Sequence, residues 1–142
     1  MTGKFWPAAA VLVVLGAALP ATDDAKEADK KGLLVGRWKV LDPDSGAQLM
    51  GIKFEEIEKD RKFGKFKETA DNKLQGANGL SCHYYRYEKN ELAFVEPKTT
   101  RVDEMLVGDV DWKGNNKFIF KIAGGYYGKG GLSGKKLEFH RD

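Results

Sequence analysis

Apolar and polar residues alternate with a period of two along much of the chain from residue 32 onward. The clearest case is Lys117–Ile122, where Phe118, Phe120 and Ile122 share one parity. Segments Gly36–Leu41 and Leu49–Ile57 show the same alternation. A period of two places successive side chains on opposite faces of a β-strand. Because no window shows a sustained helical repeat, the pattern predicts an all-β fold.

Turn sequences separate the predicted strands at intervals of about 8–12 residues, a spacing typical of sandwiches and barrels. The signals include Asp42–Gly46, with its proline and glycine, and the pair Asn78-Gly79. We therefore predict an antiparallel meander of about eight strands that closes into a small barrel, since closure removes exposed edges. The remaining predicted strands are Phe63–Glu68, Leu80–Glu88, Glu91–Glu96, a strand or strand pair over Arg101–Val110, and a last strand carrying Leu137, Phe139 and Arg141.

One predicted strand has an irregular pattern. Phe63 and Phe66 lie on opposite parities, so they cannot share a face in a regular strand. Gly64 lies between them and is a suitable position for a β-bulge that would bring both rings to one side. We therefore expect a bulge at Gly64.

The first 21 residues are predicted to be a cleaved signal peptide. Lys4 supplies a positive amino-terminal region, Ala8–Ala18 supplies eleven apolar residues, and Leu19–Ala21 offers a cleavage point. An uncleaved membrane anchor is the alternative, because the 17 residues of Phe5–Ala21 reach the lower limit for a spanning helix. The leader indicates export to the periplasm or the extracellular space.

The rest of the chain divides into a linker and one domain. Residues 22–31 are polar and contain no apolar side chain larger than alanine, so we expect a linker. Residues 32–142 are long enough for a single barrel domain. The chain carries 24 Lys and Arg against 21 Asp and Glu, which is a mixed and not a strongly basic balance. Its single cysteine excludes an internal disulfide framework.

Four local features together resemble a known fold family. Gly36-x-Trp38 opens the first strand after an apolar turn, and Arg141 lies one residue from the carboxyl terminus. Between them lie the hairpin Tyr87–Leu92 and the strand Phe118–Ile122. Over residues 32–142 the sequence resembles the lipocalin-like (calycin-type) small exported barrels, most closely a bacterial paralogous family of uncharacterised function. The resemblance implies structural roles for Gly36, Trp38 and Arg141, with Trp38 closing one end and Arg141 packing across its ring.

The alternation also predicts which side chains face the barrel interior. Two hypotheses follow from that interior. In the first, which we favour from the sequence, the interior binds a small apolar ligand. In the second, large aromatic side chains fill it, as an eight-stranded barrel allows, and the protein acts as a structural or protein-interaction module in the cell envelope. The candidates are Met50, Ile52, Phe54, Phe66, Tyr85, Phe94, Phe118 and Phe120.

Other chemical patterns in the sequence are weak. Cys82 and His83 are adjacent, so a regular strand points them to opposite faces and prevents a Cys–His dyad. Asp109–Asn116 lacks the acids of a calcium loop, and Gly124–Gly131 lacks the helix of a phosphate-binding loop. Tyr126 and Tyr127 within that glycine-rich segment are candidate contact residues.

No catalytic signature such as GxSxG or HExxH is present. We therefore expect a protein that is not an enzyme and needs no cofactor or metal. The aromatic and basic residues of Leu80–Tyr87 are more typical of barrel packing than of nucleic-acid binding, and the modest net charge of +3 also argues against nucleic acid. The sequence predicts neither the identity of a ligand or protein partner nor the oligomeric state.

Overall fold

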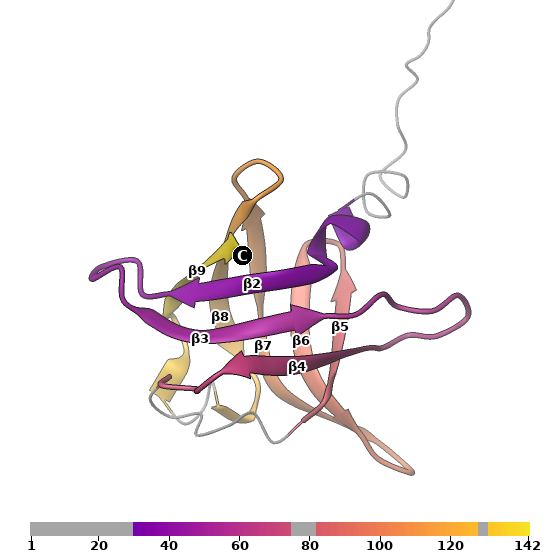
Figure 1. Ribbon diagram of the computed structural model, residues 1–142. Helices are drawn as coiled ribbons and strands as arrows, with labels where there is room; N and C mark the ends of the chain where they lie inside the picture. Colours follow the sequence, from indigo (N-terminus) through magenta and orange to yellow (C-terminus); the bar gives the residue numbers. More distant parts are fainter. Residues whose placement is uncertain (1–29, 75–81, 128–130) are drawn as a thin grey trace, which may run out of the picture. The chain divides into compact units, whose positions relative to one another are not determined.

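The computed structural model describes residues 30–74, 82–127 and 131–142. Residues 31–142 form a compact unit, an eight-stranded antiparallel closed barrel (Figure 1). The predicted signal peptide and nearly all of the predicted linker lie outside the described residues. The strands are β2 (Gly36–Leu41), β3 (Gln48–Phe54), β4 (Gly64–Ala70), β5 (Tyr84–Glu88), β6 (Glu91–Pro97), β7 (Val102–Trp112), β8 (Lys117–Gly124) and β9 (Lys136–Arg141).

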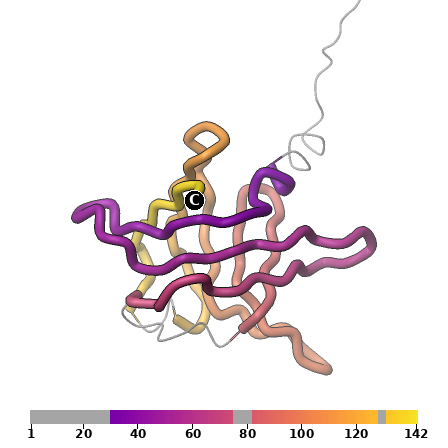
Figure 2. Tube along the Cα trace, viewed as in Figure 1, coloured from indigo at the N-terminus to yellow at the C-terminus, as the bar shows by residue number. Residues whose placement is uncertain are grey.

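The strands follow one another around the barrel as a meander, and Figure 2 shows the path of the chain. Each strand pairs with the next, and pairing of β2 with β9 closes the ring. Trp38 is opposite Ile52 on one side and Arg141 on the other. The predicted all-β meander closing into a barrel is confirmed.

Several predicted strand boundaries change. The strand predicted over Leu49–Ile57 is β3, which ends three residues earlier, at Phe54. The segment predicted over Arg101–Val110 is a single long strand, β7. β4 continues to Ala70, beyond the predicted end at Glu68. β5 begins at Tyr84, four residues after the predicted start, and residues 75–81 lie outside the described part of the chain.

The expectation of a bulge at Gly64 is wrong. Gly64 pairs with Tyr85 and Lys65 with Tyr84 in uninterrupted register, whereas the irregularity between β3 and β4 falls at Gly51. Gly64 is buried, and a Cβ there would come within 2.6 Å of the Tyr85 ring. The glycine therefore makes room for that ring. Phe63 precedes β4, so the alternation of the strand does not constrain its side chain.

The barrel interior is the hydrophobic core. Within the described residues, every buried side chain of the core is apolar or aromatic, and no charged residue is buried. A Cβ at Gly108 would lie 2.8 Å from the Phe120 ring and 2.2 Å from the main-chain oxygen of Lys121. Close packing between β7 and β8 therefore requires glycine, which has no side chain, at position 108.

Candidate functional site

The eight side chains predicted to face the interior are all buried in the barrel. Each is exposed by 4% or less, so none is open to solvent. Met50 also borders a hollow of about 320 Å³ that includes Ala70 and Asp71. The buried candidates are Met50, Ile52, Phe54, Phe66, Tyr85, Phe94, Phe118 and Phe120.

Five of these rings form one packed cluster. The Phe54 ring lies edge-on to Tyr85 at 4.8 Å between centroids and stacks with Phe94 at 6.0 Å. Phe66 meets Phe94 edge-on at 5.0 Å, and Phe120 meets Phe94 edge-on at 6.0 Å. Edge-to-face and offset contacts at these distances are the favourable aromatic geometries. The rings that line the interior therefore contact one another.

Phe118 belongs to a second group of rings, which includes side chains that were not among the predicted interior residues. It stacks with Phe139 at 4.5 Å and contacts Trp38 and Trp112, each at 4.9 Å. Phe139 shares its parity with Leu137, so the alternation of the last strand could have identified it. The alternation could not assign Trp112 to the interior, because the strand that contains it was predicted to end at Val110.

Trp38 and Arg141 meet at this end of the barrel. The Arg141 guanidinium carbon lies 4.0 Å from the Trp38 ring centroid, within the range of a cation–π contact. Arg141 also donates hydrogen bonds to the main-chain oxygens of Val35 and Leu33, at 2.9 and 2.6 Å. The Trp38 indole donates to the oxygen of Leu34 at 2.8 Å. These bonds tie the helical turn at residues 31–34 to β2 and β9.

Gly36 has a backbone φ of 122°, a conformation that side chains rarely adopt. A Cβ at this position would also lie 3.1 Å from the Arg141 guanidinium. Glycine at position 36 therefore allows the backbone to enter β2 close to the Arg141 guanidinium. Burial lowers the pKa of Arg141, but its guanidinium remains charged at neutral pH because its ordinary pKa is so high.

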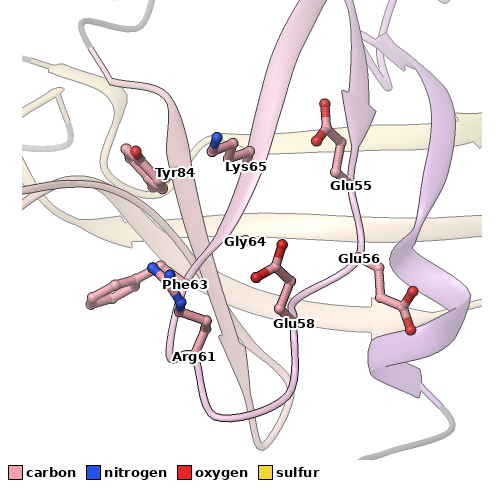
Figure 3. A pocket seen from close by; sticks show the side chains of 8 residues that line it. All are labelled: Glu55, Glu56, Glu58, Arg61, Phe63, Gly64, Lys65 and Tyr84. Atoms are coloured by element: carbon pink, nitrogen blue, oxygen red, sulfur yellow. The ribbon is translucent and has the colours of Figure 1, made fainter.

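A hollow of about 270 Å³ lies beside the connection from β3 to β4 (Figure 3). It combines three carboxylates with two basic side chains. In Figure 3 the side chain of Glu56 points away from the other lining groups. The Tyr85 hydroxyl donates to the main-chain oxygen of Glu55 at 2.5 Å and holds this segment against the barrel. The lining residues are Glu55, Glu56, Glu58, Arg61, Phe63, Gly64, Lys65 and Tyr84.

A second hollow, of about 450 Å³, lies along β7, β8 and β9. Acids and lysines both line it, and Lys113 pairs with Asp111 at 2.9 Å between Nζ and Oδ2. The charges are mixed, so the hollow has no strong preference for a cation or an anion. No group of three or more His, Cys, Asp or Glu side chains is placed to hold a metal ion in the part of the chain that the structure describes.

Cys82 and His83 lie in different environments. Cys82 is buried, whereas the His83 side chain is 80% exposed and its Nδ1 lies 3.7 Å from Glu96 Oε1. Burial, together with the negative charges of Glu96 and Glu68, raises the pKa of the Cys82 thiol to about 12. A thiol with that pKa is almost entirely protonated at neutral pH, which makes it a poor nucleophile.

We expect Cys82 to resist alkylation in the folded protein. At pH 8 the raised pKa lowers the thiolate fraction by a factor of about a thousand relative to an ordinary cysteine, and burial slows access further. The rate of reaction with iodoacetamide should be measured by mass spectrometry with and without denaturant. In the control, Cys82→Ala combined with His83→Cys, the exposed thiol should react at nearly the same rate in both conditions. Rapid alkylation of native Cys82 would contradict its burial.

No protein-family model, curated protein or solved structure gives a significant match to this chain. The class is therefore defined by the architecture itself, an eight-stranded antiparallel closed barrel with a buried aromatic core, which is consistent with a lipocalin-like fold. Among the described residues, no helix is long and apolar enough to cross a membrane.

Proposed function

We propose that this protein is a non-enzymatic interaction module that acts through its outer surface, and that its barrel interior serves as a packed core. The observation that carries the proposal is the mutual contact of the interior rings, from Phe54 through Phe94 to Phe120. An apolar ligand inside the barrel would have to displace these rings and lose their contacts. The sequence favoured ligand binding, with a filled interior as the alternative, and the packing supports the alternative.

The export predicted from the leader is part of the same proposal. An exported barrel with a filled interior can contact an envelope component or an extracellular partner only through surface side chains. The hollow of about 270 Å³ is lined mainly by charged groups, which suit polar contacts better than an apolar ligand. The hollow of about 450 Å³ combines charged groups with Pro43, Val110 and Ile119.

Phe120→Trp tests whether the interior is packed. We expect the larger ring to lower the free energy of unfolding by ~1–3 kcal/mol, because overpacking forces neighbouring groups to move. The Phe120 ring centroid lies 6.0 Å from those of Phe94 and Phe139, and its ring edge would lie 2.8 Å from a Cβ at Gly108, so little room is available. Urea unfolding should be combined with titration of an environment-sensitive apolar dye, which we expect not to bind saturably.

Ile119→Trp is the matched control, because residue 119 lies in the same strand on the opposite face and is only partly buried. We expect this variant to remain close to the wild type in stability. If Phe120→Trp were tolerated and the dye bound with a defined stoichiometry, the interior would be an open ligand site and the proposal would fail.

A further inference from the structure

The outward positions of β2, β3 and β4 carry a row of basic side chains. Arg37 is directly opposite Lys53, and Lys53 is directly opposite Lys67, so three like charges lie side by side on adjacent strands. Lys39 and Lys65 lie two residues from Arg37 and Lys67 along their strands. We refer to these five residues as the basic face. Its members point outward because the residues that alternate with them are buried.

The central residues of the basic face lack compensating charge, whereas Lys65 lies beside Glu55 and lines the same hollow as Glu55 and Glu58. Arg37 and Lys39 share only Asp142, at 3.8 and 3.9 Å. Over the described ranges, Lys53, Lys65 and Lys67 have no ion-pair partner. Like charges directly opposite one another in a sheet are destabilising. The row therefore does not contribute to the stability of the barrel, which leaves an external anion as the group that would complement it.

The opposite side of the barrel carries acids that face bases. In the ring of eight strands β7 lies four places from β3, and three of its acids pair with Arg101, Arg86 and Lys113 while Asp109 is directly opposite Lys121 on β8. On the neighbouring β5 and β6, Arg86 is the basic residue, and it pairs with Glu91 at 3.1 Å and Glu104 at 2.9 Å. The row of like charges on β2, β3 and β4 therefore differs from β7, where acids face bases.

We propose that the basic face docks the barrel onto the surface of an anionic phospholipid bilayer. This inference rests on the proposed surface function. Four of the five residues are lysines, whose compact ammonium groups lack the planar fork with which arginine binds an anion in fixed geometry. Lipid headgroups are mobile and can move to match such a set of point charges. Each lysine or arginine near an anionic bilayer strengthens binding about five-fold.

Other extended partners fit this face less well. The exposed large hydrophobic side chains of the described residues are Val102 and Tyr126, which belong to β7 and to the segment after β8. The centre of the basic face therefore carries no aromatic side chain of the kind that anchors a protein interface or stacks on single-stranded nucleic acid, and the nearest ring, Tyr84, lies opposite Lys65 at its edge. A flat set of lysines instead favours purely electrostatic, salt-sensitive attachment.

Vesicle co-sedimentation of the full chain tests this docking. We expect binding to phosphatidylcholine vesicles that contain about 30% phosphatidylglycerol at about 50 mM salt, and release at about 500 mM salt. Vesicles of phosphatidylcholine alone measure any contribution that does not depend on lipid charge. Lys53→Gln combined with Lys67→Gln should weaken binding to the anionic vesicles about 25-fold, at about five-fold for each lysine.

The matched control is Lys121→Gln combined with Lys136→Gln. These lysines are directly opposite one another on β8 and β9, so the control removes the same net charge from another face. We expect its vesicle binding to change by less than about three-fold, because these lysines would lie away from the bilayer. Thermal unfolding should show that both double variants are folded. Removing the repulsion between Lys53 and Lys67 should not destabilise the variant that lacks both lysines.

Several results would overturn the proposal. These are absence of binding at low salt, equal binding to neutral vesicles, and equal losses in the two double variants. Binding of soluble polyglutamate through Lys53 and Lys67 without vesicle binding would instead indicate an acidic protein partner. None of these results bears on the packed interior, which Phe120→Trp and the dye titration test separately.

Discussion

Trp38→Ala should lower the free energy of unfolding by ~3–5 kcal/mol, the usual range for removing a large buried aromatic side chain. Trp38 is fully buried and contacts both Phe118 and Trp112, so its removal opens a cavity between rings of different strands. The loss also ends the hydrogen bond from its indole to Leu34. Urea denaturation followed by circular dichroism measures the change.

The partner variant Arg141→Ala should cost less than Trp38→Ala. Arg141 is partly exposed, but its guanidinium joins β9 to Val35, Leu33 and the Trp38 ring. Because the two side chains are in contact, we expect the double variant to be non-additive. Additivity within about 0.5 kcal/mol would show that their contact contributes no coupling.

We expect Gly108→Ala to destabilise the barrel by about 3 kcal/mol, at the upper end of the range for overpacking. A Cβ at residue 108 would approach the main-chain oxygen of Lys121 to 2.2 Å. A backbone atom held in the β7–β8 ladder cannot move aside as a flexible side chain can. The pairing of Gly108 with Ile122 would therefore have to shift, and urea denaturation should show a lower midpoint.

Gly124→Ala is the control for this substitution. Gly124 pairs with Val107 in the same two strands, but nothing lies within 4 Å of a Cβ built there. Its stability should stay within about 0.5 kcal/mol of the wild type, as is usual for surface substitutions. Equal destabilisation by both variants would indicate a general effect of replacing glycine in this strand pair and not a steric clash at residue 108.

The alternation of apolar residues was sufficient to identify the interior face of most strands. Phe118 and Phe120 are buried as their parity predicted, because a strand has only two faces and the apolar one is buried in the barrel. The same rule failed at Phe63 and Gly64, since Phe63 lies outside the strand and its parity carries no information. Element boundaries depend on partner strands, which a local pattern does not contain.

The basic face shows a second limit of prediction from the sequence. Arg37, Lys53 and Lys67 are far apart in sequence, and each is unremarkable as an outward residue of an alternating strand. The register of β2 with β3 and of β3 with β4 brings them into one row. The overall balance of 24 basic and 21 acidic residues does not reveal this row, because composition does not record position.

The sequence by itself determined the fold class, the antiparallel order of strands and the set of apolar side chains that face inward. These properties follow from local periodicity and from turn residues, both of which act over a few neighbouring positions. The tertiary structure alone decided that the interior rings fill the barrel by contacting one another. It also decided that Arg37, Lys53 and Lys67 form one row on the outer surface. Both depend on the closure and register of strands distant in sequence, which fix the distances between their side chains.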